Sequence, residues 1–190
     1  MDIRHLPAQS RLARPWRNGG GVTSDIAVFP DDSGDDGFQW RASIATITDA
    51  GPFSSWPGVD RTLLVLRGQL TLGTEARGEM QLDEWTSAFA FAGEEQVVAR
   101  PLGTPCLVLN LMIRRGQTRF RLRRQSNALP IVADQTLLLA TQSTTISVNG
   151  LSIPLDERDA LLFGPDRASS LEIDRTVIVM EFSNISAGSS

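Results

Sequence analysis

Residues 61–72 read RTLLVLRGQLTL, an apolar and β-branched run, a tight turn at a glycine, and a returning run of the same kind. Residues 144–155 read TTISVNGLSIPL and repeat this layout around an Asn-Gly pair, which is typical of two-residue hairpin turns. Each stretch is followed by an acidic turn and an apolar strand, LDEWTSAFAF (82–91) and LDERDALLF (155–163). The pattern therefore predicts two hairpins and a duplicated β unit within one chain.

Short apolar runs between Gly, Pro, Asp and Ser clusters fill the rest of the chain, and no helical period persists. The expected strands are 22–29, 38–47, 62–67, 69–72, 88–91, 96–99, 106–113, 119–122, 136–140, 145–148, 151–153, 160–163, 171–173 and 176–182. Many short strands at this spacing indicate a barrel or sandwich. The boundary between the two units is expected near the Arg-rich stretch 116–124.

Composition places the chain among ordinary globular proteins. Of 190 residues, 41% are hydrophobic and 21% are charged, and no apolar run is long enough to span a membrane. The N-terminal segment lacks the apolar core of a signal peptide, and Cys106 has no disulfide partner in the chain. We therefore expect a cytoplasmic protein. The net charge of -4 argues against general nucleic-acid binding.

Two arginines lie at unusual positions in the expected strands. Alternation along 38–47 places Arg41 and Ser43 on one face. Arg41 is then either a solvated outward side chain or an inward one that needs a partner, because an unpaired buried charge costs about 3 to 5 kcal/mol. Arg61 enters an apolar strand at its end, where a guanidinium is either solvated or positioned to hold a carboxylate through two hydrogen bonds.

Asn110 and a glycine run are two further anomalies. Asn110 interrupts the apolar run CLVLNLM (106–112). A buried amide without hydrogen bonds costs about 1 to 3 kcal/mol, so Asn110 bonds either to backbone or to a ligand. In WRNGGG (16–21), three consecutive glycines lose much backbone entropy on ordering. Close approach of this backbone to another group would justify that loss; the alternative is a flexible linker. The lysine of a Walker-type phosphate loop is missing.

Three segments together resemble the HutD/Ves family: PWRNGGGVTSDI (15–26), FQWRASIATITDAGPFSSWPGVDRTLLVLRG (38–68) and LNLMIRRG (109–116). The resemblance implies an all-β bicupin with two cupin-like barrel or sandwich units. Residues 1–116 would carry the pocket, and residues 117–190 would form a supporting unit with a disordered tail after about 184.

HutD members accompany bacterial histidine-utilisation genes, so the resemblance implies a small-molecule binder or regulator that acts on this pathway. We expect its ligand to be a small anionic metabolite. Urocanate and formylglutamate are the candidate ligands. Carried over by position, the expected pocket residues are Trp16, Asn18, Thr23, Arg41, Ser43, Arg61, Asn110 and Met112. We expect Arg61, with Arg41, to neutralise a carboxylate, while Asn18, Ser43 and Asn110 orient the rest of the ligand.

Other functions remain as alternatives. His5 is the single histidine, so we expect neither a metal site nor another cofactor. An isomerase or hydrolase of a small organic acid could use Asp25 or Asp60 in acid-base chemistry. Nucleic acid or a protein could bind the arginines, although ion pairs or a solvated edge strand also explain them. An exposed barrel edge would allow a homodimer. The arginines are Arg114, Arg115, Arg119, Arg121, Arg123 and Arg124.

Overall fold

The computed structural model describes residues 2–16, 19–34, 36–103, 105–165 and 170–185. Regular structure in this part consists of β-strands and one 3-10 turn, η1 (Ala8–Ser10), which confirms the all-β prediction. Within these residues, no helix has the length and apolarity needed to cross a membrane. The chain folds as two compact units, a continuous unit of residues 12–115 and a discontinuous unit of residues 1–11 together with 116–190.

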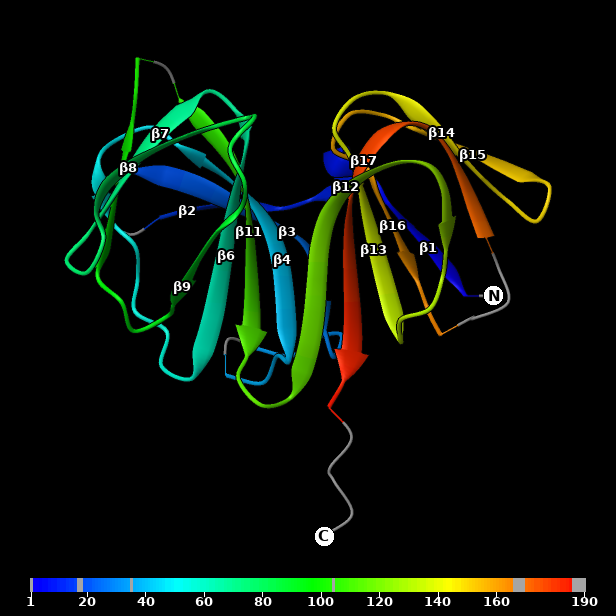
Figure 1. Ribbon diagram of the computed structural model, residues 1–190, viewed down its shortest axis with the longest axis horizontal. Helices are drawn as coiled ribbons and strands as arrows, with labels where there is room; N and C mark the ends of the chain where they lie inside the picture. The colour runs from blue at the N-terminus through cyan, green and yellow to red at the C-terminus, as the bar shows by residue number, and fades with distance from the viewer. Residues whose placement is uncertain (1, 17–18, 35, 104, 166–169, 186–190) are drawn as a thin grey trace, which may run out of the picture. The chain divides into compact units, whose positions relative to one another are not determined.

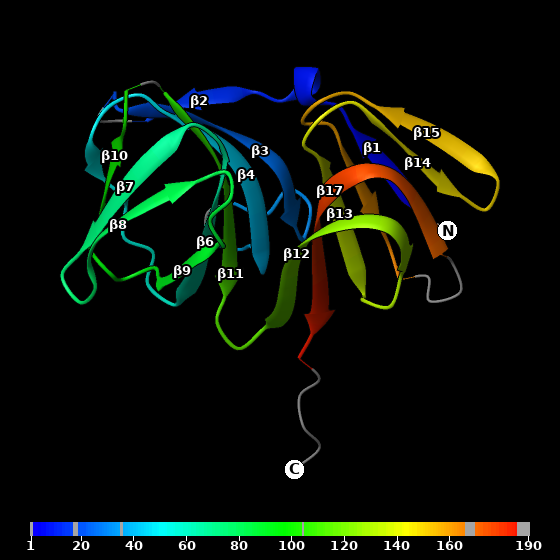
Figure 2. The same ribbon diagram turned by 45° about the horizontal axis from the view of Figure 1, so that its top comes forward.

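Two antiparallel sheets form the continuous unit (Figures 1 and 2). The six-stranded sheet has the order β2 (Ala13–Pro15), β3 (Gly21–Phe29), β4 (Trp40–Ile47), β11 (Cys106–Arg114), β6 (Val59–Arg67) and β9 (Phe89–Ala92). The four-stranded sheet has the order β5 (Gly51–Pro52), β10 (Val97–Pro101), β7 (Gln69–Thr74) and β8 (Gly78–Asp83). A core between the sheets combines side chains of both, among them Ile47, Val65, Leu72 and Val97.

The predicted hairpin at 61–72 is wrong. β6 pairs with β11 and β9, whereas β7 pairs with β10 and β8, so the chain passes from one sheet to the other between β6 and β7. Gly68 makes this corner with a φ of +89°, a conformation that favours glycine. A Cβ on Gly68 would lie 3.3 Å from the carbonyl oxygen of Pro105 and 3.4 Å from the Cα of Cys106, so there is little room for a side chain. A glycine between two apolar runs therefore marks a corner here.

The discontinuous unit is built on one seven-stranded sheet. Its order is β1 (Ile3–Leu6), β16 (Ala160–Phe163), β13 (Gln135–Ala140), β17 (Ser170–Asn184), β14 (Thr144–Val148) and β15 (Leu151–Leu155), and β12 (Thr118–Pro130) also pairs with β17. The hairpin predicted at 144–155 is confirmed, with Asn149 and Gly150 both at positive φ. Its core includes Leu129, Leu138 and Phe163.

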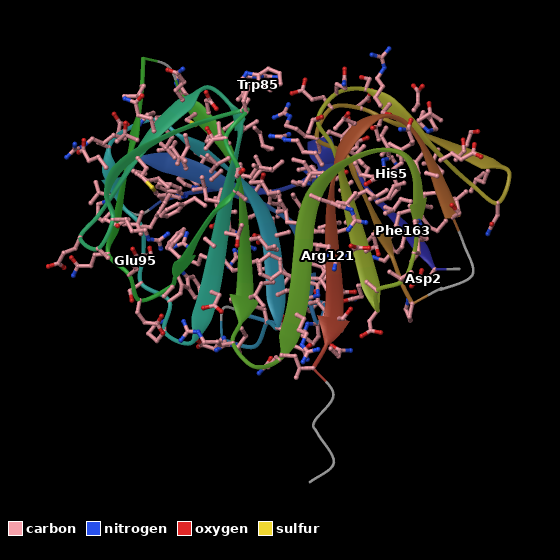
Figure 3. The ribbon with its side chains drawn as sticks, in the orientation of Figure 1. Asp2, His5, Trp85, Glu95, Arg121 and Phe163 are labelled. Atoms are coloured by element: carbon pink, nitrogen blue, oxygen red, sulfur yellow. The ribbon has the colours of Figure 1, made fainter. Side chains whose placement is uncertain are left out.

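The first eleven residues do not fold with the unit in which the sequence placed them. β1 pairs with β16, Ile3 packs against the core of the discontinuous unit, and Nε2 of His5 lies 3.1 Å from Oδ2 of Asp159. Figure 3 labels His5 on this strand. β1 has only four residues, IRHL, and two of them are polar, so its alternation is too short to predict a strand. The sequence therefore predicted residues 1–116 as one unit. The continuous unit ends at residue 115, and the second segment of the discontinuous unit begins at residue 116.

Each expected strand overlaps an observed one, but several boundaries differ. Residues 171–173 and 176–182 belong to one strand, β17, and the expected strand 119–122 extends through β12 to Pro130. Four observed strands were not expected: β1, β2, β5 and β8. The predicted tail falls on residues 186–190, which lie outside the described residues, while Ile185 still donates its N–H to the carbonyl of Gln117 at 3.0 Å.

Leu138 and Leu151 offer a matched test of the discontinuous unit's core. Leu138 is fully buried, whereas Leu151 on β15 is 57% exposed. We expect Leu138→Ala to lower the free energy of unfolding by about 2 to 5 kcal/mol, through lost burial and the cavity left behind. Leu151→Ala should change it by less than about 0.5 kcal/mol. Urea unfolding followed by circular dichroism measures both, and equal losses would contradict this description of the core.

Candidate functional site

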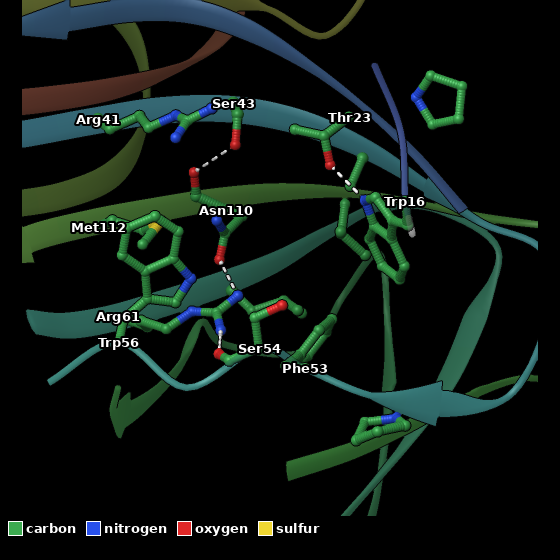
Figure 4. Close-up of a pocket in the computed structure, with 15 residues that line it drawn as sticks. Trp16, Thr23, Arg41, Ser43, Phe53, Ser54, Trp56, Arg61, Asn110 and Met112 are labelled. Carbon is green, nitrogen blue, oxygen red and sulfur yellow. Dashed lines mark hydrogen bonds between the residues drawn. The ribbon is translucent and has the colours of Figure 1, made fainter. Parts of the chain in front are cut away.

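A cavity of about 610 Å³ opens inside the continuous unit (Figure 4). Strands β3, β4, β6 and β11 and the segment between β5 and β6 supply most of its wall. The described lining residues are Pro15, Trp16, Thr23, Arg41, Ser43, Ala45, Pro52, Phe53, Ser54, Trp56, Arg61, Leu63, Val108, Asn110 and Met112.

The strand register explains why distant polar residues meet at this cavity. Asn110 on β11 is opposite Ser43 on β4, and Met112 is opposite both Arg41 on β4 and Arg61 on β6. Residues two apart along a strand share a face, so these side chains continue the inward face that supplies the core farther along each strand. One end of the interior is therefore apolar and the other is polar.

The structure brings together nearly all of the predicted site residues. Arg41 and Ser43 share the inward face, and Asn110 and Met112 project from the neighbouring strand. Asn18 lies outside the described residues. The remaining predicted residues that line the cavity are Trp16, Thr23 and Arg61. Their contact with a ligand stays a prediction.

Arg61 is the most deeply buried charge in the cavity wall, with 6% of its surface exposed. Its guanidinium lies over the rings of Phe53 and Phe91, with the central carbon 4.9 and 5.0 Å from the ring centroids. Nη1 donates to the carbonyl of Ser54 and Nη2 to Oδ1 of Asn110, both at 3.1 Å. Arg61 is therefore buried in the cavity wall, although it lies near the start of its strand.

The surroundings of Arg61 leave its charge without compensation. No carboxylate of the described residues lies within ion-pair distance of it, and its Nε is buried without a hydrogen-bond partner among them. Burial in this apolar setting lowers the pKa of Arg61 to about 10. The group remains cationic at neutral pH, in an environment where a bound anion would be strongly stabilised.

Arg41, by contrast, pairs with a carboxylate, that of Asp25, which also lies 3.8 Å from Arg14. Its Nε and Nη2 donate to the two carboxylate oxygens of Asp25 at 2.8 and 3.0 Å. Asp25 is therefore held by an arginine. Asp60 is exposed, is not among the described lining residues, and accepts a hydrogen bond from Arg115. The two aspartates considered for acid-base chemistry are both in ion pairs in this structure.

The sequence left open whether Asn110 bonds within the protein or to a ligand, and the structure allows its side chain to do both. Its Oδ1 accepts from Arg61, and its backbone carbonyl accepts a long, 3.4 Å hydrogen bond from the hydroxyl of Ser43. The amide oxygen is therefore satisfied within the protein and helps to orient the guanidinium. The amide nitrogen has no hydrogen-bond partner among the described residues, so it can donate to a ligand.

The glycine run brings backbone close to an aromatic ring of the same chain. A Cβ on Gly21 would lie 2.6 Å from the carbonyl of Thr46 and 3.1 Å from the indole of Trp16. The indole N–H donates to Oγ1 of Thr23 at 2.7 Å, and the backbone N–H of Trp16 donates to the carbonyl of Gly21. The run is therefore ordered around Trp16 where it is described.

Sequence reasoning missed the wall contributed by Phe53, Ser54 and Trp56. The stretch GPFSSWPG (51–58) lies between two expected strands, and none of its residues was among the expected pocket residues. The segment is anchored because Phe53 and Trp56 donate their N–H groups to the carbonyls of Val97 and Gly93 at 2.9 and 2.8 Å. A Cβ on Gly93 would lie 2.2 Å from the carbonyl of Trp56, so this approach requires glycine.

The arginine-rich stretch is partly paired. Arg115 contacts Asp60 and Glu94, and Arg123 contacts Glu181. The hydrogen bond from Arg115, with help from the N–H of Gly58, lowers the pKa of Glu94 to about 2. Arg119 and Arg121 are exposed on β12. Among the described residues, no cluster of three His, Cys, Asp or Glu side chains is placed to hold a metal ion.

Comparison with known proteins gives a consistent family. The sequence model named HutD matches residues 8–180. An uncharacterised 21.2 kDa protein from the hutC 3′ region of Pseudomonas putida is 36% identical over 193 residues, covering 95% of this chain and 97% of that protein. Protein Ves of Citrobacter koseri is 35% identical over 137 residues, covering 72% of this chain and 64% of its own length.

Solved structures agree with the sequence comparison. HutD from Pseudomonas fluorescens SBW25, solved in a formate condition, has a TM-score of 0.85 and 26% identity, covering 97% of this chain and all of its own. Bacterial pirin from Escherichia coli, in complex with nickel(II), has a TM-score of 0.64 at 13% identity, covering 95% of this chain and 98% of its own, and shares the fold alone. The match to the family model over most of the chain and the identity to the P. putida protein show that the chain belongs to the HutD family.

Proposed function

We propose that the cavity of the continuous unit binds a small carboxylate metabolite through Arg61, without a metal, and that this binding modulates histidine utilisation. The observation that supports the proposal most directly is the charge of Arg61, which is buried, oriented by two hydrogen bonds and without a counterion among the described residues. A carboxylate would supply that counterion. Urocanate and formylglutamate are the candidate ligands.

The electrostatics of the wall favour an anion. Arginines are the only titratable side chains among the described lining residues, and the charge of Arg41 is balanced by Asp25. The cavity therefore carries an excess positive charge at Arg61, where burial of the guanidinium strengthens its interaction with an anion. The amide nitrogen of Asn110 and the hydroxyl of Ser43 would orient the polar parts of the ligand.

The size of the cavity fits a metabolite. Its volume of about 610 Å³ lies within the range of about 300 to 1,000 Å³ typical of small-molecule sites. The link to histidine utilisation comes from the HutD family and from the hutC-region name of the P. putida relative. A protein that binds an intermediate of that pathway could report its concentration to a partner or regulator.

Arg61→Ala tests the anion site directly. A charge-assisted contact to a carboxylate contributes about 1.5 to 3 kcal/mol, so the variant should bind about ten- to a hundredfold more weakly. The measurement is calorimetric titration with urocanate, formylglutamate, glutamate and formate. Arg100→Ala is the matched control, because Arg100 belongs to the same unit but forms an exposed ion pair with Glu79.

The outcomes are distinct. Saturable binding of one of these acids that Arg61→Ala loses and Arg100→Ala retains would support the proposal. Equal affinity of Arg61→Ala and the unaltered protein would remove Arg61 from the site. Absence of binding for all four acids would contradict the carboxylate proposal itself.

The lowered pKa of Arg61 predicts a pH dependence for anion binding. The cationic form binds the anion, so affinity should be constant at neutral pH and fall as the pH rises through about 10, the pKa of the free site. Above that value the fall should approach about tenfold per pH unit. Formate is the suitable probe, because it stays ionised throughout. Circular dichroism at each pH checks the fold, and an affinity that stays unchanged through pH 11 would refute a role for Arg61 protonation.

A further inference from the structure

Gly21, the last residue of the glycine run, helps to set the position of Trp16 in the cavity wall. The indole N–H of Trp16 donates to Oγ1 of Thr23 at 2.7 Å (Figure 4). The backbone N–H of Trp16 donates to the carbonyl of Gly21 at 2.9 Å, and a Cβ on Gly21 would lie 3.1 Å from the indole ring. An indole held both by its ring nitrogen and by its backbone has little rotational freedom. Trp16 is therefore a fixed wall of the cavity.

This wall is linked to the anion site through one aromatic ring. Trp16 contacts Phe53 edge to face, with ring centroids 6.1 Å apart, and Phe53 in turn lies against the guanidinium of Arg61. A ligand whose carboxylate binds Arg61 would thus extend its remaining atoms through a space bounded by Trp16 and Trp56. Flat, conjugated groups pack well against indole faces.

Resting on the proposed function, we infer that Thr23 and Gly21 are positioning residues that hold Trp16 so that the site prefers a flat, conjugated carboxylate. Thr23 acts through the indole: its Oγ1 is the acceptor that fixes the ring. Gly21 acts by having no Cβ, because a Cβ would collide with the carbonyl of Thr46 on the neighbouring strand, which cannot move aside as a flexible side chain could.

Two carboxylates of different length can separate the effect of the Trp16 wall from the effect of Arg61. Formate has no side chain to extend from Arg61 toward Trp16, whereas urocanate carries a flat side chain that, in this proposal, would lie along the indole. A defect in the wall should therefore weaken urocanate binding and leave formate binding unchanged. A general defect in the fold or in Arg61 would weaken both.

Thr23→Val removes the acceptor while keeping the shape of the side chain, and Thr23→Ser restores the hydroxyl. We expect Thr23→Val to weaken urocanate binding about three- to tenfold, the worth of one hydrogen bond. Formate affinity should stay within twofold of the unaltered protein, and Thr23→Ser should recover most of the urocanate affinity. Thr71→Val is the control, because Thr71 is a buried threonine of the same unit outside the lining residues.

A double-mutant cycle with Trp16→Phe distinguishes action through the indole from direct contact of Thr23 with the ligand. Trp16→Phe keeps an aromatic ring but lacks the N–H that Thr23 accepts. If Thr23 acts through Trp16, adding Thr23→Val to Trp16→Phe should weaken urocanate binding no further. Additive losses in the cycle would assign Thr23 to the ligand and overturn the inference.

Failure of this inference is distinguishable from failure of the proposed function. Equal losses for formate and urocanate in Thr23→Val, or no loss for either, would overturn the role of Thr23 while the anion site at Arg61 stands. Formate binding without urocanate binding in the unaltered protein would overturn the preference for flat carboxylates. If neither acid binds, both proposals fall together.

Discussion

The continuous unit depends on how it accommodates one buried positive charge. Leaving a charge unpaired inside a protein is costly, and Arg61 is held there by two phenylalanine rings, an amide oxygen and a backbone carbonyl. These contacts fix the guanidinium but do not neutralise it. If the proposed anion binds here, the lost folding stability would be offset by preorganisation, because the groups that would meet the anion are already in place.

The same strands build both the core and the cavity. Along β6 the inward face carries Val65, then Leu63, then Arg61, so the core becomes a polar wall by changing residue type every second position. The corner at Gly68 follows the end of β6 directly and takes the chain to the opposite sheet, where β7 begins. A hairpin at that point would have left the interior open on one side.

Features that depend on neighbouring residues in the sequence could be predicted, whereas features that depend on contacts between distant residues could not. Alternation within a strand is local, so the shared face of Arg41 and Ser43 and the oddity of Asn110 were readable from the sequence. The partner of Arg41 was not, because Asp25 reaches it through a neighbouring strand. The corner after β6 looks like a hairpin turn in sequence, since both require glycine between apolar runs. Phe53 and Trp56 were missed because a loop has no period, and their positions depend on anchors at Val97 and Gly93.

The pairing of β1 with β16 also bears on how the protein is made. The continuous unit is one uninterrupted segment, so all of its strands leave the ribosome before residues 116–190 are made, and domains generally form in this N-terminal-first order during synthesis. The discontinuous unit must wait, because His5 and Asp159 are separated by 154 positions in the sequence. Contacts of such long range are slow to form. The N-terminal strand therefore stays without its sheet until most of the chain has emerged, and the two units would acquire their folds one after the other.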